Sequence, residues 1–146
     1  MKLCLEDLKK KELWEKAGIQ LPKFDIEAMR KATAENCRWV HFGAGNIFRG
    51  FPAARMQDLL EAGLADTGIV VGEGFDHQII DDIYVPYDNL YLMATLKSNA
   101  TVDLRVIASI AQAYKCSTQL KEDWEALKKI FRNPALQMVS FTITEK

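Results

Sequence analysis

WVHFGAGNIFRGF, residues 39–51, has two glycines one residue apart, directly after a short apolar run. The run predicts a strand, and the apolar spacing from Met56 to Gly63 predicts a helix after the glycines. A tight turn between a strand and a helix brings free N–H groups and the positive end of the helix dipole to one point, which attracts phosphate. Gly43 permits the turn, and Gly45 lets a pyrophosphate approach without meeting a Cβ atom. The stretch therefore indicates a dinucleotide-binding turn.

Neighbouring residues leave a second interpretation open. Phe48 occupies the third glycine position of the fingerprint GxGxxG, and a lone GxG also occurs in ordinary turns. Pro52 removes an N–H donor, so we expect the helix to begin late, near Phe51. Arg49 would then lie on a long loop, where it either faces the phosphates or is a plain surface residue.

Acidic residues follow the second apolar run, GIVVGEGFD. Glu73 and Asp76 stand where dinucleotide-binding folds carry the carboxylate that holds the adenosine ribose. Either carboxylate would favour NAD over NADP, because a 2′-phosphate would meet like charge. Acidic residues are also common at solvated strand ends, and the sequence does not decide between the two positions.

The order of elements predicts a helical N-terminal extension over residues 1–35 and one α/β domain over residues 36–146. In the extension, we expect a helix at residues 5–16 and another after the N-cap Asp25. In the domain, we expect strands at 38–42, 67–73, 89–96, 102–110 and 136–144, helices at 51–63, 77–85 and 119–131, and a polar run at 111–117. The strand at 102–110 is expected to pair back onto the strand at 89–96 after the turn KSNAT. Ser117 or Thr118 is expected to cap the last helix. Strands that alternate with helices favour a Rossmann-like, mainly parallel sheet with helices on both faces.

Composition and cysteine usage exclude several classes of protein. Lys and Arg total 19 against 20 Asp and Glu, so the net charge of -1 gives no electrostatic footprint for nucleic acid or an anionic membrane. Cys4, Cys37 and Cys116 lack the spacing of a disulfide framework or a zinc site, and His41 and His77 are expected to be structural. The N-terminal residues resemble neither a signal peptide nor a membrane span. We therefore expect a soluble cytoplasmic protein with no nucleic acid, membrane or metal among its partners.

The motif HFGAGNIFRGF, with an aromatic residue and Arg-Gly after GxGN, resembles the cofactor loop of the mannitol dehydrogenase family, the polyol-specific long-chain dehydrogenases. The resemblance continues through VPYDNLYLMATL and RVIASI to FRNPALQMVSFTITEK, and so covers about residues 36–146. Within the family, the sequences of these motifs are most similar to those of the fructuronate reductases, which interconvert D-fructuronate and D-mannonate. Mannitol 2-dehydrogenases and tagaturonate reductases are close neighbours.

The resemblance implies an NAD-dependent oxidoreductase that interconverts a sugar ketone and a secondary alcohol. Hydride would pass between the nicotinamide and the keto carbon of a small sugar acid or polyol. Thr142 and Thr144, at the end of the last strand, could reach the nicotinamide side of the cofactor, and filling the strand is the alternative role for at least one of them. The expected cofactor-binding residues are Gly43, Ala44, Gly45, Asn46, Ile47, Arg49, Glu73, Asp76 and Thr142.

The catalytic lysine, asparagine and histidine of the family belong to a largely helical C-terminal domain. They match no residue of this chain, so no catalytic residue is assigned, and Lys146 is not the catalytic lysine. We expect the chain to be the truncated N-terminal part of a larger enzyme, inactive alone, whose open sheet surface favours self-association. The alternative class is a non-catalytic nucleotide-binding or interaction domain that kept the loop without the chemistry.

Overall fold

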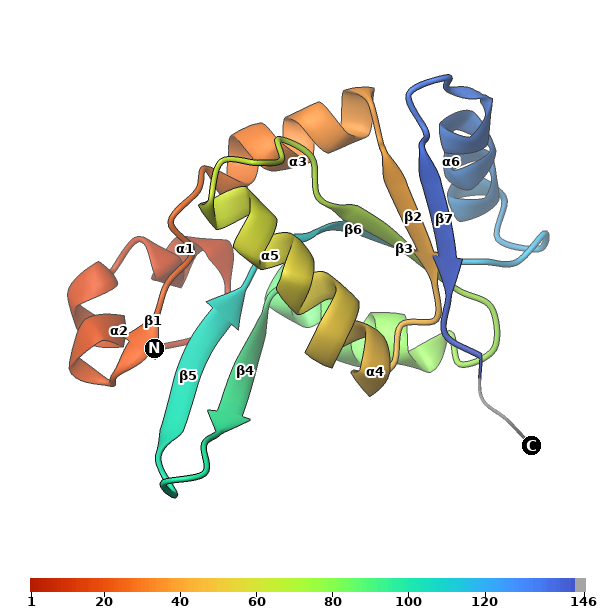
Figure 1. Cartoon of the computed structure of the whole chain (residues 1–146). Helices are drawn as coiled ribbons and strands as arrows, with labels where there is room; N and C mark the ends of the chain where they lie inside the picture. The colour runs from red at the N-terminus through yellow and green to blue at the C-terminus, as the bar shows by residue number, and fades with distance from the viewer. Residues whose placement is uncertain (144–146) are drawn as a thin grey trace.

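The structure is a computed structural model that describes residues 1–143 (Figure 1). Its strands are β1 (Ile19–Gln20), β2 (Trp39–Phe42), β3 (Ile69–Glu73), β4 (Tyr91–Leu96), β5 (Val102–Ile107), β6 (Ile110–Lys115) and β7 (Met138–Phe141). Its α-helices are α1 (Leu5–Leu8), α2 (Lys11–Lys16), α3 (Ile26–Glu35), α4 (Asn46–Phe48), α5 (Ala54–Glu61) and α6 (Lys121–Arg132). The turns η1 (Arg49–Ala53) and η2 (Ile80–Tyr84) are π-helical, and η3 (Val85–Tyr87) is a 3-10 turn.

A parallel sheet in the order β6-β3-β2-β7 forms the centre of the fold. β3 is buried along its whole length, because strands of a parallel sheet are covered on both faces. On one face, Val71 joins an apolar cluster with Phe48 of α4. On the other face, Val70 joins a cluster with Leu127 of α6. The predicted Rossmann-like class, a mainly parallel sheet with helices on both faces, is confirmed.

A second, smaller sheet has the order β1-β5-β4, and Figure 1 shows its β4–β5 hairpin projecting from the molecule. The expected pairing of residues 102–110 back onto 89–96 is confirmed, because β5 pairs antiparallel with β4 from Tyr91↔Ile107 to Leu96↔Val102. The alternation of strands and helices predicts that both strands belong to the central sheet, and this is wrong. Only five residues separate β4 from β5, which suits a hairpin and is too short for a helical crossover.

The prediction of a polar run at residues 111–117 is also wrong, because β6 occupies most of it. β6 pairs in parallel with β3 and is an edge strand of the central sheet. Ala113 packs against the apolar cluster, while Gln112 and Lys115 are half-buried at the edge. An edge position tolerates polar residues, so the apolar alternation typical of a strand is weak here.

The predicted helix over residues 5–16 is two short helices, α1 and α2. Leu8 and Trp14 enter the same apolar cluster, and the indole Nε1–H of Trp14 donates to the carbonyl of Asp7 at 2.9 Å. In one continuous helix, side chains six positions apart would point to different faces. The break therefore lets both side chains reach the core.

The helix caps are only partly as expected. A carboxylate oxygen of Asp25 accepts the N–H of Ala28 at 2.9 Å, which confirms the predicted N-cap of α3. The predicted cap of α6 is wrong, because Leu120 occupies the N-cap position without a side-chain bond. The hydroxyl of Ser117 instead accepts the N–H of Gln119 in the preceding turn.

The helix after the glycine turn begins at Asn46, and the prediction that it begins near Phe51 is wrong. α4, η1 and α5 follow one another without a break, and Pro52 lies inside the π turn η1. Pro52 cannot donate a backbone hydrogen bond to the preceding turn, and a wider π turn absorbs that irregularity. Arg49 therefore lies on the helix and not on a long loop.

Within residues 1–143, no helix has both the length and the apolar composition that crossing a lipid bilayer requires. The same residues contain no group of three or more His, Cys, Asp or Glu side chains arranged to hold a metal ion.

Candidate functional site

The glycine turn joins β2 to the helix at the carboxyl ends of the parallel strands. Gly43 has a φ of 111°, which side chains rarely allow, and its N–H donates to the carbonyl of Gly72 at 2.9 Å. A Cβ atom at Gly43 would lie 3.2 Å from the Cβ of Thr142. At Gly45, directly before the helix, a Cβ atom would meet no atom within 4 Å. Gly43 is therefore required by the chain itself, whereas Gly45 borders open space.

Ala44, between the two glycines, is fixed on both sides. Its N–H donates to Oε2 of Glu73 at 2.7 Å, and its carbonyl accepts the hydroxyl of Tyr84 at 2.7 Å. Burial raises the pKa of Tyr84, so the hydroxyl stays protonated and able to donate. The middle of the turn is thus held by the end of β3 and by η2.

The Glu73 carboxylate braces the loop that follows β3. Its Oε1 accepts the N–H groups of Phe75 at 2.9 Å and Asp76 at 3.3 Å, in addition to the bond from the glycine turn to Oε2. Burial of Glu73, which is 8% exposed, raises its pKa, but the backbone hydrogen bonds outweigh this effect and hold the pKa below its ordinary value. Asp76 is exposed. The two acidic positions therefore differ, since Glu73 is bonded within the chain and Asp76 is open to solvent.

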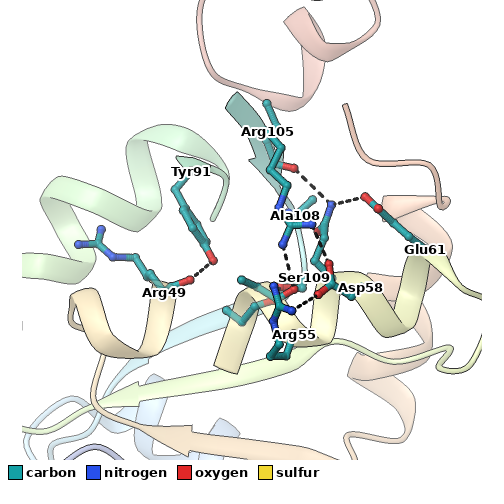
Figure 2. Close-up of polar contacts among 12 residues, drawn as sticks. Arg49, Arg55, Asp58, Glu61, Tyr91, Arg105, Ala108 and Ser109 are labelled. Carbon is teal, nitrogen blue, oxygen red and sulfur yellow. Dashed lines mark hydrogen bonds and ion pairs between the residues drawn. The ribbon is translucent and has the colours of Figure 1, made fainter. Parts of the chain in front are cut away.

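The remaining predicted residues of the loop lie at the start of the helix. A guanidinium nitrogen of Arg49 donates to Oδ1 of Asn46 at 2.5 Å, and its guanidinium carbon lies 5.9 Å from the centre of the Tyr84 ring. Ile47 is 69% exposed. Figure 2 shows the hydroxyl of Tyr91 pointing at the carbonyl of Arg49, to which it donates a hydrogen bond. The guanidinium adds positive charge beside the positive end of the helix dipole.

A buried polar chain joins β2 to β7 beside the turn. His41 is 2% exposed, with Nδ1 2.8 Å from Oγ of Ser140 and Nε2 2.8 Å from Oγ1 of Thr142. The Ser140 hydroxyl also accepts the indole N–H of Trp39 at 2.7 Å. Burial lowers the pKa of His41, which favours the neutral imidazole. These hydrogen bonds fix Thr142 next to the glycine turn. Thr144 lies outside the described residues.

A second polar cluster anchors η1 and α5 to β5 and to the segment between β5 and β6 (Figure 2). Arg105 and Asp58 form an ion pair at 2.7 Å. Gln57 is fully buried, and its Oε1 accepts a backbone N–H of that segment at 2.9 Å. The hydroxyl of Ser109 donates to the carbonyl of Ala53, in the π turn, at 2.6 Å. These contacts fix the position of the continuous helix formed by α4, η1 and α5, which begins directly after the glycine turn.

The structure brings all the predicted site residues to one edge of the central sheet. They lie at or just after the carboxyl ends of β2, β3 and β7, and the glycine turn follows β2, which lies between β3 and β7 in the sheet. In open α/β sheets, this edge near a change of crossover side is where ligands bind. The sequence analysis did not identify Tyr84 and Tyr91, because an aromatic residue in an apolar segment carries no signal of the carbonyl that its hydroxyl will reach.

Comparison with known proteins finds sequence similarity to two oxidoreductases. No protein-family model matches the chain. Over all 146 residues, the chain is 51% identical to the D-mannonate oxidoreductase of Thermotoga maritima. The predicted resemblance to the mannitol dehydrogenase family is confirmed. Over 133 residues, 88% of the chain, it is 28% identical to the polyol:NADP oxidoreductase of Gluconobacter oxydans.

Solved dehydrogenases share the fold. D-sorbitol dehydrogenase, in a substrate-free crystal structure, matches 88% of the chain with a TM-score of 0.71 and 29% identity. Mannitol 2-dehydrogenase of Pseudomonas fluorescens, in a ternary complex with NAD and D-mannitol, matches 98% of the chain with a TM-score of 0.76 and 22% identity. The chain spans about a quarter of the length of these relatives, from 25% to 27%.

Proposed function

We propose that this chain carries the NAD-binding site of an oxidoreductase that interconverts a sugar ketone and a secondary alcohol. The main support is the open space at Gly45, where a Cβ atom would meet no atom of the chain within 4 Å. The first N–H groups of a helix have no acceptor within the helix, and they attract anions. A pyrophosphate suits this position, because it is anionic and Gly45 presents no side chain to it. The 51% identity to D-mannonate oxidoreductase supports the same function.

Within this proposal, the residues of the turn have different roles. The N–H groups of Gly45, Asn46 and Ile47 bind the pyrophosphate, and the Arg49 guanidinium adds charge to the same place. Both backbone groups of Ala44 are already bonded within the chain, so Ala44 shapes the turn and does not bind phosphate. The Gly43 conformation starts the turn, and Thr142, held by the buried histidine, lies toward the nicotinamide.

The acidic residues support NAD over NADP within the proposal. Asp76 is the candidate ribose ligand because it is exposed, whereas the Glu73 carboxylate is bonded to backbone N–H groups and positions the loop. Both carboxylates would repel a 2′-phosphate. The relatives differ in cofactor, since the Pseudomonas fluorescens complex contains NAD and the Gluconobacter oxydans protein is named for NADP. Parallel titrations with NADH and NADPH would therefore decide the preference.

We propose D-fructuronate and D-mannonate as the substrate pair, because the relative that is 51% identical is named a D-mannonate oxidoreductase. Mannitol 2-dehydrogenase and tagaturonate reductase are alternatives with the same chemistry, and a non-catalytic nucleotide-binding or interaction domain is the alternative of another class. When bound, NAD(H) supplies or accepts the hydride, and the residues of this chain bind and orient it. Since no residue here is assigned to polarise the substrate carbonyl, the chain alone is expected to be inactive.

The proposal also includes the surroundings of the site. Self-association through β7 is supported by the exposed apolar residues Met138, Phe141 and Ile143, of which the last two are 62% and 83% exposed. A reducing cytoplasm is supported by three free cysteines. The division into an extension (1–35) and a dinucleotide-binding domain (36–146) is kept as part of the proposal.

Titration of NADH into the chain, followed by nicotinamide fluorescence, tests the proposed function. The decisive variant is Gly45→Val, whose Cβ atom would meet no atom of the chain within 4 Å and whose side chain would occupy the space before the helix. Gly50→Ala is the control, because it also adds atoms into open space but lies beyond the turn. We expect saturable binding by the unchanged chain and by Gly50→Ala, and loss of binding in Gly45→Val. An unchanged chain that does not bind NADH, or equal binding by all three proteins, would contradict the proposal.

A further inference from the structure

Phe75 is the most exposed of the large apolar side chains in residues 1–143. Its exposed fraction is 101%, so it contacts almost nothing in the chain. Isolated apolar residues are normal on a protein surface, and exposure alone therefore carries no conclusion. What distinguishes Phe75 is its place, two residues after the end of β3 and at the same edge of the sheet as the glycine turn.

The backbone at Phe75 is tied to the glycine turn through one side chain. Oε1 of Glu73 accepts the N–H of Phe75 at 2.9 Å, and Oε2 of the same carboxylate accepts the N–H of Ala44 at 2.7 Å. The N–H of Asp76 donates to Oε1 as well, at 3.3 Å. A single buried carboxylate thus sets the position of Phe75 relative to the start of the helix, which preorganises both for a common ligand.

Open space adjoins both ends of this link. A Cβ atom at Gly74 would meet no atom within 4 Å, as at Gly45. The neighbouring strand β6 also ends here, since the N–H of Cys116 donates to the carbonyl of Glu73 at 2.7 Å. A surface hollow of about 440 Å³, lined by Lys115 and residues 119–123, lies just beyond that end. A ligand anchored at the glycine turn can therefore extend along the edge toward Phe75.

We propose that Phe75 is the stacking platform for the adenine base of a dinucleotide held at the glycine turn. This inference rests on the proposed function. With the pyrophosphate at the helix start and the ribose at the exposed carboxylate of Asp76, the base lies next in order along the ligand, where Phe75 stands. An adenine face gains from contact with an aromatic ring, and stacking of this kind tolerates a ring that is otherwise free in solvent.

The test compares ligands that do and do not contain adenine. ADP-ribose, titrated by calorimetry, contains the adenine, both riboses and the pyrophosphate, whereas reduced nicotinamide mononucleotide lacks the adenosine. Phe75→Ala is expected to weaken the binding of ADP-ribose and of NADH about fivefold or more, which is the range for removal of an aromatic side chain that stacks on a base. It is expected to leave the affinity for reduced nicotinamide mononucleotide unchanged within about twofold, because that ligand does not reach the ring.

Two further variants separate stacking from a general surface effect. Phe75→Trp should retain the affinity for ADP-ribose, and the emission of the added indole, after subtraction of the emission of the unchanged chain, should be quenched on binding. Leu64→Ala is the matched control, since Leu64 is 76% exposed and precedes β3, at the opposite edge of the sheet. It should bind all three ligands like the unchanged chain. Circular dichroism should show the same fold for every variant, because neither side chain is packed.

The outcomes separate this inference from the proposed function. Weaker binding of the adenine-containing ligands by Phe75→Ala, with rescue by Phe75→Trp, supports both. ADP-ribose binding that is unaffected by Phe75→Ala overturns this inference alone, and it would leave another segment or a second copy of the chain to cover the ring. An unchanged chain that binds neither ADP-ribose nor NADH overturns both.

Discussion

Gly43 and Gly45 contribute to the turn in different ways. The φ of 111° at Gly43 and its close approach to Thr142 make a side chain unfavourable there, whereas a side chain at Gly45 would project into open space. The first glycine therefore serves the fold. The second is dispensable for the fold, so its absence of a side chain is explained by the ligand that the turn is proposed to bind.

Alanine at Gly43 and alanine at Gly45 are therefore expected to affect different properties of the chain. Gly43→Ala should lower the free energy of unfolding by about 1–3 kcal/mol, because it forces a side chain into a strained conformation. Gly45→Ala should change the free energy of unfolding by less than about 0.5 kcal/mol, but it should weaken the binding of NADH. Urea unfolding followed by circular dichroism measures the first effect. Equal losses of stability in the two variants would contradict the assignment.

Glu73 gives a second prediction at this scale. Glu73→Gln should cost about 1–3 kcal/mol, because the amide NH₂ group replaces an oxygen that accepts a buried backbone N–H. The control Asp76→Asn, at an exposed position, should leave stability unchanged. Since the folded-state pKa of Glu73 lies below its ordinary 4.5, its contribution is present above pH 4.5 and is lost as the pH falls through the folded-state value. The free energy of unfolding of Glu73→Gln should lack this part of the decrease at low pH. An equal decrease in the variant would contradict the claim that the Glu73 carboxylate braces the loop after β3.

His41 gives the chain a pH dependence near neutrality. Burial holds its folded-state pKa below the ordinary 6.5, so the unfolded chain binds the proton first as the pH falls. The free energy of unfolding should therefore be highest above pH 6.5 and decrease as the pH falls from 6.5 through the folded-state value. Urea unfolding at several pH values measures the slope. In His41→Gln, which is less stable but does not titrate, the slope over this range should be smaller, and an unchanged slope would assign it to other groups.

At the scale of elements, the helix after the glycine turn depends on contacts around its π turn. Pro52 interrupts the hydrogen bonding of the helix, and the carbonyls of Arg49 and Ala53 accept hydroxyls of Tyr91 and Ser109 from other elements. The helix start is thus held in place by side chains that come from β4 and from the segment before β6. This explains how a proline can follow the turn closely without displacing it.

Ser109→Ala tests this support. Ser109 and Ala53 are both fully buried, so the variant leaves a buried carbonyl without its donor and should cost about 1–3 kcal/mol. Ser98→Ala, at an exposed position in the β4–β5 turn, is the matched control and should have no effect. Amide exchange in residues 46–53 should accelerate in the first variant only. A neutral Ser109→Ala would show that the π turn does not need this contact.

The elements that the sequence predicts well are those with strong local signals. The apolar runs of β2 and β3, the capping Asp25 and the glycine turn depend on neighbouring residues, and the structure has them at the predicted places. β6 and the separate sheet of β4 and β5 depend on long-range pairing, which local patterns do not contain. The predicted start of the helix near Phe51 is wrong for a different reason. The local effect of Pro52 favours a late start, but tertiary contacts hold the helix from Asn46 onward.

At the scale of the whole molecule, β7 leaves an apolar surface uncovered. Among the described residues it pairs with β2 along one edge, and Met138, Phe141 and Ile143 are exposed. We expect the chain to self-associate through this surface, with the apparent mass in sedimentation equilibrium rising with concentration. Phe141→Glu should shift the protein toward the monomer. A monomer over the whole concentration range would contradict this part of the proposal.

The candidate site was predicted to a similar extent. The sequence motif and the family resemblance identified residues that the structure gathers at one sheet edge, but not the side chains that brace them. Tyr84 and Tyr91 reach backbone carbonyls from distant segments, and the brace by Glu73 is visible only once β3 lies beside β2. Contacts of this kind follow from the fold and not from residue type.

The most direct test of the central claim is to map NADH binding on the unchanged chain by the amide resonances of its residues. The account predicts saturable shifts in residues 43–49 and 73–76 and at Thr142. A separate surface hollow of about 920 Å³ is lined by residues between Leu5 and Glu27, and these residues should not respond. Shifts confined to that hollow, or no shifts at NADH concentrations that saturate dehydrogenases, would contradict the claim that the glycine turn is a dinucleotide site.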